Sequence, residues 1–305
     1  MKISAECTAL GAGVLAIVAW IVSLVRFAMW RQQVVRDLRA HGTVVKTPRG
    51  PIEYAEVGNG LPVLFVHGTP GGYDTSLAYI KTTHLDTRGY RYIMPSRPGY
   101  LRTPLSVGET PREQAQAFAA LLTELGIDKV IVWAGSGSGP SGLEFVLQYP
   151  HRCSALILVE ALTQRPTGAP PRPSVLMDYF VWQFGRFMVS RWQATNPSDR
   201  DISAIGYAVI NAMVPGNVRL TGQLNDVKQY AQIVNWPLNQ IQCPTLILHG
   251  TADKNVAIAN SEQAHAQIAG SQFVKFPDAD HFMVVTKHRQ LNDVIGDFLA
   301  KHVKS

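Results

Sequence analysis

Hydrophobic residues along the chain follow two patterns: short continuous runs, and runs spaced as on one face of a helix. The continuous runs end at glycine or in a loop, as expected for strands buried on both faces of a sheet. They occur in PVLFVHG (62–68), YRYIMP (90–95), KVIVWAG (129–135), SALILVE (154–160), TLILHG (245–250) and SQFVKF (271–276). Helical patterns lie between them. Strands that alternate with helices predict an α/β fold, with a mostly parallel sheet covered by helices on both faces.

The helical pattern of TPREQAQAFAALLTELGI begins with Thr110 as a capping residue and Pro111 in the first turn. Further helices are predicted in GPSGLEFVLQYP, where Pro150 ends the pattern, and in RQLNDVIGDFLAKHV near the end of the chain. Strand residues around Arg49 and Gly50 predict an opening hairpin that closes at GNG (58–60).

Residues 162–235 interrupt this alternation. The segment begins with the proline-rich RPTGAPPRPS, continues with the helical pattern VLMDYFVWQFGRFMVSRW, and contains no strand-like run. It predicts a helical cap over the carboxyl edge of the sheet, where open α/β folds bind ligands. The core of the domain is then divided into residues 43–161 and 236–305.

The N-terminus has a different pattern, because residues 7–25 (CTALGAGVLAIVAWIVSLV) carry no charge and are apolar on every face. This is roughly the length that one helix needs to cross a bilayer. A secretory signal is the first alternative, but the run is long for one and no small-x-small cleavage site follows. A buried soluble helix is the second, and it would have a polar face. We therefore predict a transmembrane anchor at residues 7–29.

Positive charges follow the uncharged run 7–25, whereas Lys2 and the amino terminus before it are partly offset by Glu6. This bias predicts a single-pass membrane protein with its C-terminal domain on the cytoplasmic side. The basic residues that follow the segment are Arg26, Arg31, Arg36 and Arg39.

Composition restricts the other functions. The 305 residues are 46% hydrophobic and 16% charged, which is ordinary for a globular domain with one large core. The net charge is +6, but Lys and Arg are scattered, so nucleic-acid binding is not expected. Cys7, Cys153 and Cys243 lie far apart in the sequence and an odd number cannot all pair, so no disulfide framework is expected. No metal-ligand spacing is present, and neither a metal nor another cofactor is expected.

The stretch VIVWAGSGSGPSGLEF (130–145) contains two serines at a predicted strand-to-helix turn. Such a turn tolerates only small residues two positions either side of a nucleophilic serine. Ser136 meets this demand with Ala134 and Ser138, whereas Ser138 would put Pro140 at one of the small positions. Ser136 is therefore the candidate. The alternatives are a turn that only allows strand and helix to approach, or a phosphate-binding loop.

Two later loops provide the partners that a serine nucleophile needs. A base must take the hydroxyl proton and a carboxylate must orient that base. Asp253 follows the strand of TLILHG, and His281 follows the strand of SQFVKF. The chain order Ser, Asp, His is the order of one of the three folds that carry such a triad.

With these residues in place, the chain resembles the α/β-hydrolase superfamily over residues 45–303, in particular its branch of serine esterases and peptidases. HGTPG (67–71) is similar to the oxyanion loop HGxPG of that superfamily, and SRPGYLRT (96–103) is similar to its segment DRPGYGRS, with Ser96 and Leu101 as departures. The segments PTLILHGTAD (244–253) and DH (280–281) also match this superfamily. The resemblance implies the α/β-hydrolase fold with Ser136, Asp253 and His281 as catalytic residues.

The resemblance also implies an oxyanion hole. Gly137 N–H lies at the start of the helix after the turn, and the resemblance makes Thr69 N–H the second donor. His67 is expected to shape the loop. Glu160, at the end of LILVE, is expected either to face the site or to form a salt bridge.

The aromatic residues of the cap are expected to form core and to line an apolar substrate pocket. The candidates for substrate binding are Tyr179, Trp182 and Phe184.

The resemblance restricts the reaction, because haloalkane dehalogenases and epoxide hydrolases use a carboxylate where this chain has Ser136. Proline iminopeptidases share the HGxPG loop but need an acidic cluster for the substrate amine, and the cap contains few acids: Asp178, Asp199, Asp201 and Asp226. We therefore expect a carboxylesterase that acts on a small-molecule ester, uncharged or acidic, with an apolar portion. The alternatives are an iminopeptidase-like aminopeptidase and a non-catalytic binding protein on the same fold.

Overall fold

The computed structural model describes residues 2–166, 175–233 and 235–303. The proline-rich stretch at the start of the predicted cap lies largely outside the described residues. The chain divides into two compact units, Met1–His41 and Gly42–Ser305.

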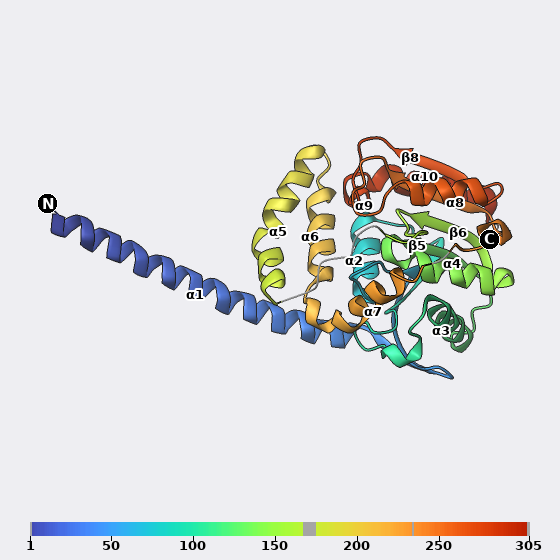
Figure 1. Cartoon of the computed structure of the whole chain (residues 1–305), viewed down its shortest axis with the longest axis horizontal. Helices are drawn as coiled ribbons and strands as arrows, with labels where there is room; N and C mark the ends of the chain where they lie inside the picture. Colours follow the sequence, from blue (N-terminus) through green and yellow to red (C-terminus); the bar gives the residue numbers. More distant parts are fainter. Residues whose placement is uncertain (1, 167–174, 234, 304–305) are drawn as a thin grey trace. The chain divides into compact units, whose positions relative to one another are not determined.

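The first unit is one helix, α1 (Lys2–His41), shown in blue in Figure 1. It extends beyond the predicted anchor, because residues 30–41 are mostly good helix formers. Within the described residues, one helix is long and apolar enough to cross a membrane. It is α1, and its candidate span is Leu10–Leu38. Leu15 and Trp20 there are 71% and 59% exposed. A signal sequence near the N-terminus would also meet these criteria of length and apolar composition.

The second unit is built on an eight-stranded sheet in the order β1-β2-β4-β3-β5-β6-β7-β8. The β1–β2 and β2–β4 pairs are antiparallel and all other pairs are parallel, which confirms the predicted mostly parallel sheet. The strands are β1 (Thr43–Thr47), β2 (Gly50–Val57), β3 (Leu61–Val66), β4 (Tyr90–Pro95), β5 (Val130–Gly135), β6 (Cys153–Val159), β7 (Thr245–Gly250) and β8 (Gln272–Phe276).

Two details follow directly from the local sequence. The predicted hairpin is formed by β1 and β2, with Thr47 opposite Gly50, and Gly50 has a φ of +120° that residues with a side chain rarely adopt. Helix α3 (Pro111–Glu124) begins at the predicted cap, where Thr110 and Glu113 form a reciprocal capping box.

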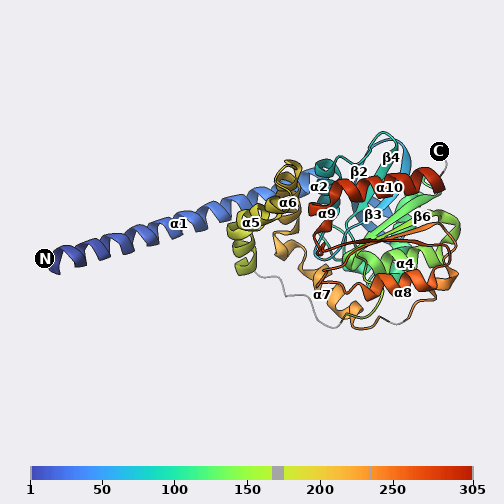
Figure 2. The ribbon, with the colours of Figure 1, turned by 90° about the horizontal axis from the view of Figure 1, so that it is seen from above.

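Helices cover both faces of the sheet, and successive strand residues alternate between two hydrophobic cores. The covering helices besides α3 are α2 (Tyr73–Thr83), α4 (Gly139–Gln148), α8 (Ala259–Gln267), α9 (Met283–Thr286) and α10 (His288–His302). In β5, Val132 and Ala134 pack in the core that includes residues of α3, α4 and α8, while Ile131 and Trp133 pack in the core that includes residues of α2 and α10. Figure 2 shows α4 and α8 on one side of the strands and α10 on the other.

The described residues of the insertion between β6 and β7 form three α-helices: α5 (Val175–Thr195), α6 (Asp201–Met213) and α7 (Leu220–Tyr230). Trp192 of α5 packs with Ile205 and Ile210 of α6 in a small separate core. Among the described residues of this insertion there is no strand, as predicted.

Two of the cysteines lie closer together than their separation in the sequence suggests. Cys153 at the start of β6 and Cys243 just before β7 are free thiols with a Sγ–Sγ distance of 3.4 Å. They are brought together because β6 and β7 are adjacent parallel strands.

Candidate active site

Ser136 lies in the sharp turn between β5 and α4. Its φ is +51°, a left-handed conformation that is uncommon for a residue with a side chain. Leu162 N–H donates to Ser136 O over 2.9 Å and holds this peptide in place. Strand and helix pack closely here, since a Cβ on Gly142 would lie 2.5 Å from the Cβ of Ala134. Strained positions of this kind are concentrated at functional sites.

The competing serine has a different role. Ser138 is fully buried, and its Oγ donates to Val66 O over 2.9 Å and accepts from Gly135 N–H over 2.8 Å. Its hydroxyl therefore stabilises the turn. Ser136, in contrast, lines the large cavity of this domain.

The structure brings the three residues selected in the sequence together at the carboxyl edge of the sheet. Ser136 Oγ lies 3.0 Å from His281 Nε2, and His281 Nδ1 lies 2.7 Å from Asp253 Oδ2. Because Nδ1 donates to the carboxylate, Nε2 is left to accept the serine proton, which is the tautomer that a general base requires.

Asp253 is held in its ionised form. Burial alone would raise the pKa of its carboxyl, but hydrogen bonds from His249 and His281 outweigh that effect and lower the pKa below its usual range. Its Oδ1 also accepts backbone N–H groups of Asn255 and Val256, over 2.7 and 2.9 Å. His249, in β7, is also close to this carboxylate, since its Nε2 lies 3.3 Å from Asp253 Oδ2.

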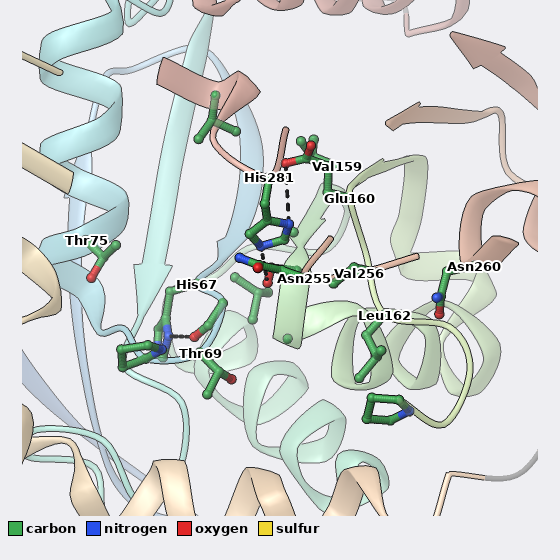
Figure 3. Close-up of a pocket in the computed structure, with 18 of the residues that line it drawn as sticks. His67, Thr69, Thr75, Val159, Glu160, Leu162, Asn255, Val256, Asn260 and His281 are labelled. Atoms are coloured by element: carbon green, nitrogen blue, oxygen red, sulfur yellow. Dashed lines mark hydrogen bonds and ion pairs between the residues drawn. The ribbon is translucent and has the colours of Figure 1, made fainter. Parts of the chain in front are cut away.

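Glu160 follows β6 and faces the same site, as Figure 3 shows. One of its carboxyl oxygens lies 3.9 Å from His281 Nδ1, and its side chain is 3% exposed. Burial, with a smaller effect of Asp253, raises the pKa of Glu160 to about 9. This carboxyl is therefore a neutral acid at pH 7, and Asp253 supplies the negative charge beside the imidazole.

We expect Glu160→Gln to retain activity and to change the pH dependence of stability. Between its ordinary pKa of 4.5 and the folded value of about 9, the folded protein holds a proton that the unfolded chain has released. The free energy of unfolding therefore decreases as the pH rises through this interval, and glutamine removes that decrease. The variant should gain a few degrees in Tm over the wild type at pH 8 but not at pH 4.5.

The measurement is thermal unfolding at both pH values, with the exposed Glu124→Gln as control. Equal pH profiles for the wild type and Glu160→Gln would contradict the raised pKa. A loss of turnover above about tenfold would identify Glu160 as an acid that orients His281.

The loop after β3 is shaped by His67. Arg97 N–H donates to His67 Nε2 over 2.9 Å, and His67 Nδ1 lies 2.8 Å from Gly68 O, so both ring nitrogens are used. Burial, followed by the charge of Arg97, lowers the pKa of His67 well below its usual value. The ring is neutral and fixes the backbone of the loop.

This loop lies against the serine turn. A Cβ on Gly68 would lie 3.2 Å from the Cβ of Ser136. A Cβ on Gly137 would lie 2.9 Å from the Cβ of Thr69 and would collide with the Tyr230 hydroxyl. Thr69 and Gly137 are therefore adjacent, and both lie next to Ser136.

Ser136 and His281 open into a cavity of about 890 Å³. Its wall includes the apolar side chains Phe65 and Trp133 of the sheet. The described residues of the cap that line it are Leu162, Gln164, Arg165, Pro166, Val209, Met213, Gln223 and Tyr230.

The aromatic residues predicted to bind substrate lie elsewhere. Tyr179, Trp182 and Phe184 are on α5, and none of them is among the residues that line the cavity. Phe184 is 53% exposed, and neighbouring apolar side chains of the same helix are exposed as well. The described part of the cap contributes to the cavity through residues 162–166, α6 and α7 instead.

The four acids of the cap all have other partners. Asp178 accepts Gly216 N–H over 3.0 Å, and Asp226 forms a buried ion pair with Arg97. Asp199 and Asp201 both pair with the Arg289 guanidinium. None of the four lines the cavity.

Two groups of side chains within the described residues have the spacing of metal ligands: Glu160, Asp253 and His281, and Asp199, Asp201 and His288. In the first group, Asp253 already accepts from His281 and Glu160 is neutral. In the second, Arg289 already supplies the positive charge. The contacts around both groups are those of hydrogen-bond networks.

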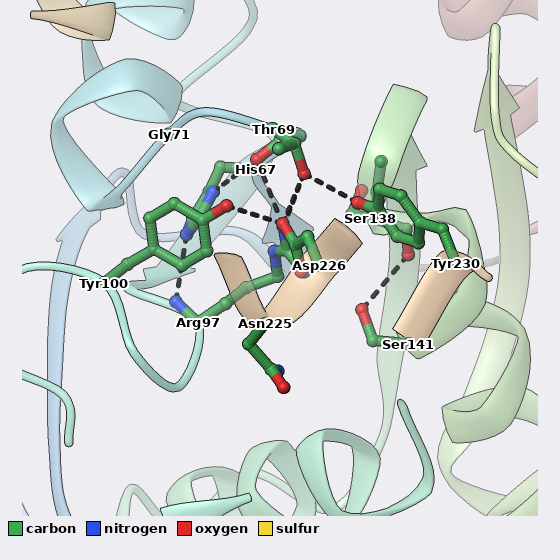
Figure 4. Close-up of polar contacts among 12 residues, drawn as sticks. His67, Thr69, Gly71, Arg97, Tyr100, Ser138, Ser141, Asn225, Asp226 and Tyr230 are labelled. Carbon is green, nitrogen blue, oxygen red and sulfur yellow. Dashed lines mark hydrogen bonds and ion pairs between the residues drawn. The ribbon is translucent and has the colours of Figure 1, made fainter. Parts of the chain in front are cut away.

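Three residues near the site were not assigned a role from the sequence: Arg97, Asp226 and Tyr230. They contact the loop and the serine turn, and Figure 4 shows them around Thr69. Arg97 is part of the segment SRPGY and Asp226 is one of few acids in the cap, but these patterns alone give neither residue a role at the site. Their pairing joins residues 129 positions apart, which no local pattern indicates.

Comparisons with known proteins agree with this fold. A family model described as "Alpha/beta hydrolase family" matches residues 63–294. An uncharacterized hydrolase, YcgS of Bacillus subtilis (strain 168), is 30% identical over 73% of this chain and 85% of its own length. A 2-hydroxy-6-oxo-6-phenylhexa-2,4-dienoate hydrolase of Burkholderia cepacia is 32% identical over 82% of this chain and 91% of its own. The solved structure of an alpha/beta hydrolase fold protein from Nakamurella multipartita has a TM-score of 0.76 and 31% identity, and covers 85% of this chain and 98% of that one.

Proposed function

Because the chain belongs to the alpha/beta hydrolase family, we propose that it is a membrane-anchored serine hydrolase, and most specifically a carboxylesterase. The observation that carries the proposal is the continuous hydrogen-bonded path from Ser136 Oγ through the His281 ring to Asp253, with distances of 3.0 and 2.7 Å. A serine hydroxyl becomes nucleophilic when it has such partners.

The reaction has two halves. Ser136 Oγ attacks the ester carbonyl while His281 Nε2 takes the hydroxyl proton, and the carbonyl electrons move to the oxygen. His281 then gives that proton to the departing alkoxide, and the acyl group stays on Ser136. A water molecule repeats the sequence on the acyl-enzyme and releases the carboxylic acid. Asp253 stabilises the imidazolium that forms in each half.

The negative oxygen of the tetrahedral intermediate needs donors that are already in position. Thr69 N–H and Gly137 N–H are the two in our proposal, since their residues are adjacent and both border Ser136. Loss of one such donor costs about 3–4 kcal/mol of transition-state stabilisation.

The cavity supports an acyl compound with an apolar portion. Phe65, Trp133 and Met213 line it, and the exposed cations Arg165 and Lys254 lie on its wall. The carboxyl of Glu160 is neutral at pH 7. A site of this kind accepts uncharged or anionic substrates and offers no counterion for an amine.

This argument favours an esterase over an aminopeptidase. A substrate amine requires a free carboxylate in the pocket, and the four cap acids are all paired away from the cavity. Hydrolysis of a carbon–carbon bond next to a ketone is the second candidate, because the Burkholderia cepacia relative is named a dienoate hydrolase.

The test is turnover of three kinds of substrate by the full chain: short p-nitrophenyl esters, aminoacyl anilides, and a 2-hydroxy-6-oxo-dienoate. We expect the esters to have the highest kcat/KM. A higher value for the anilides would replace the proposal by the peptidase, and a higher value for the dienoate would replace it by carbon–carbon hydrolysis. If no substrate is turned over and a fluorophosphonate does not label Ser136, the protein is a non-catalytic binding protein.

Membrane attachment is the second part of the proposal. The stretch Leu10–Leu38 supports it, and the arginines after residue 25 support a cytoplasmic domain. The cap adds to this support, because α5 exposes apolar side chains that a water-facing helix rarely gathers. They are Val175, Leu176, Met177, Phe180, Phe184, Phe187 and Met188.

We expect the protein to stay in the membrane fraction after an alkaline carbonate wash, with its N-terminal segment intact by mass. The physical reason is that a helix with this apolar length leaves the bilayer only at a large cost in free energy. A soluble protein whose mass shows cleavage after the apolar run would make the segment a secretory signal.

A further inference from the structure

We propose that Tyr230, on the cap helix α7, is a positioning residue that fixes the distance between the two oxyanion-hole residues, Thr69 and Gly137. This inference rests on the proposed serine hydrolase mechanism and adds to it a role for the cap. The cap would then hold the catalytic machinery in shape, in addition to enclosing the substrate.

One phenol oxygen contacts both residues. The Tyr230 hydroxyl donates to Gly137 O over 2.6 Å and lies 2.6 Å from Thr69 Oγ1 (Figure 4). The two contacts come from different parts of the core, since Thr69 follows β3 and Gly137 follows β5. Gly137 has to be glycine for this arrangement, because a Cβ there would collide with the phenol and with Thr69 Oγ1.

The phenol is held in a fixed position and protonation state. Tyr230 is 6% exposed, and burial, followed by the charge of Asp226, raises the pKa of its hydroxyl. It therefore keeps its proton at neutral pH and donates one hydrogen bond.

A buried ion pair holds the other side of Thr69. Arg97 Nη1 donates to Asp226 Oδ1 over 2.9 Å, and both side chains are 2% exposed. Thr69 Oγ1 also contacts Asp226 Oδ2, and Arg97 Nη2 donates to Thr69 Oγ1 over 3.0 Å. Tyr100 OH donates to Asp226 Oδ2 over 2.5 Å.

Helix α7 thus supplies both Asp226 and Tyr230, one turn apart, to a single threonine side chain. Without the phenol, the loop at Thr69 and the turn at Gly137 would lose their direct link. An oxyanion hole is sensitive to such a change, because its donors act only when they point at the position of the developing charge. Binding of the ground-state substrate depends mainly on the cavity wall and is affected less.

The test is Tyr230→Phe in the full chain, with the exposed Tyr207→Phe on α6 as matched control. Loss of a whole oxyanion donor lowers kcat by about 10²–10³, so a displaced pair should lower it by about 10- to 100-fold. We expect KM for a p-nitrophenyl ester to change by less than about threefold. Affinity for a trifluoromethyl ketone, which forms the tetrahedral adduct, should fall in parallel with kcat. Tyr207→Phe should match the wild type in all three.

A second pair of variants guards against a simple folding defect. Thr69→Ser keeps the hydroxyl and should lose less kcat than Thr69→Val, which removes the hydroxyl and should resemble Tyr230→Phe. The double variant Thr69→Val/Tyr230→Phe should lose less than the product of the two single losses, because both break the same link.

The outcomes separate this inference from the proposed function. If the wild type hydrolyses esters through Ser136 but Tyr230→Phe keeps its kcat and its affinity for the ketone, the positioning role is wrong and the esterase stands. A kcat loss with unchanged ketone affinity also overturns the positioning role. If the wild type shows no turnover that depends on Ser136, the function is wrong and the inference with it.

Discussion

Replacing Ser136 by alanine is expected to lower kcat for ester hydrolysis by about 10⁴- to 10⁶-fold, because the covalent route is lost and only oriented binding remains. The fold should be unaffected, because the substitution removes only the Ser136 hydroxyl, and Ser136 Oγ bonds only His281 among the described residues. The measurements are p-nitrophenyl ester turnover and the mass of the fluorophosphonate-labelled peptide that contains residue 136.

Ser138→Ala is the matched control, two residues away in the same turn. It should keep turnover within about tenfold of the wild type, and it should lose about 1–3 kcal/mol in the free energy of unfolding, because its buried hydroxyl bonds the backbone. Equal, slow turnover by the wild type and Ser136→Ala would refute the nucleophile.

Replacing Asp253 by asparagine is expected to have the second largest effect, a loss of about 10⁴ in kcat with a smaller change in KM. The amide has nearly the shape of the carboxylate but no charge, so it cannot stabilise the imidazolium. It also does not hold His281 in the tautomer with Nε2 free. The Glu160 carboxyl lies 3.9 Å from His281 Nδ1, but it does not replace the Asp253 carboxylate at pH 7, because its raised pKa keeps it neutral.

Asp278→Asn and Asp280→Asn are the controls for this substitution. Both residues lie just before His281 in the sequence and both side chains are exposed. Asp278 has a φ of +56°, a conformation that asparagine tolerates well. Their kcat values should stay within about threefold of the wild type. A larger loss of kcat from Asp280→Asn than from Asp253→Asn would contradict the proposal and show that Asp280, and not Asp253, orients His281.

The parts of the fold that sequence could predict are those that depend on short-range patterns. Thr110 and Glu113 cap α3 within one turn, and the continuous apolar runs became strands because both faces of the sheet are covered. Ser136, Asp253 and His281 could be selected because each follows a strand. Carboxyl ends of parallel strands meet at one edge, so the sheet itself brings these three together.

The wall of the cavity could not be predicted in the same way. The aromatic residues of α5 and the apolar residues of α6 have similar patterns, and periodicity does not tell which side of a cap helix faces the sheet. The structure lines the cavity with Val209 and Met213 of α6, and leaves Phe180 and Phe184 of α5 exposed.

Contacts between distant segments were equally hidden. Cys153 and Cys243 approach each other because β6 and β7 are neighbours across the cap insertion. Arg97 and Asp226 form their ion pair only because α7 returns to the loop after β4. In both cases the strand order had to be known first, and a single sequence does not contain it.

The position of β8 at the edge of the sheet has a consequence for biosynthesis. His281 follows this strand, so its imidazole is the last of the three proposed catalytic groups to leave the ribosome. Until that happens, Ser136 has no proton acceptor, however completely the first six strands have folded. On the proposed mechanism, an emerging chain is therefore inert toward acyl compounds until the final strand has joined the sheet.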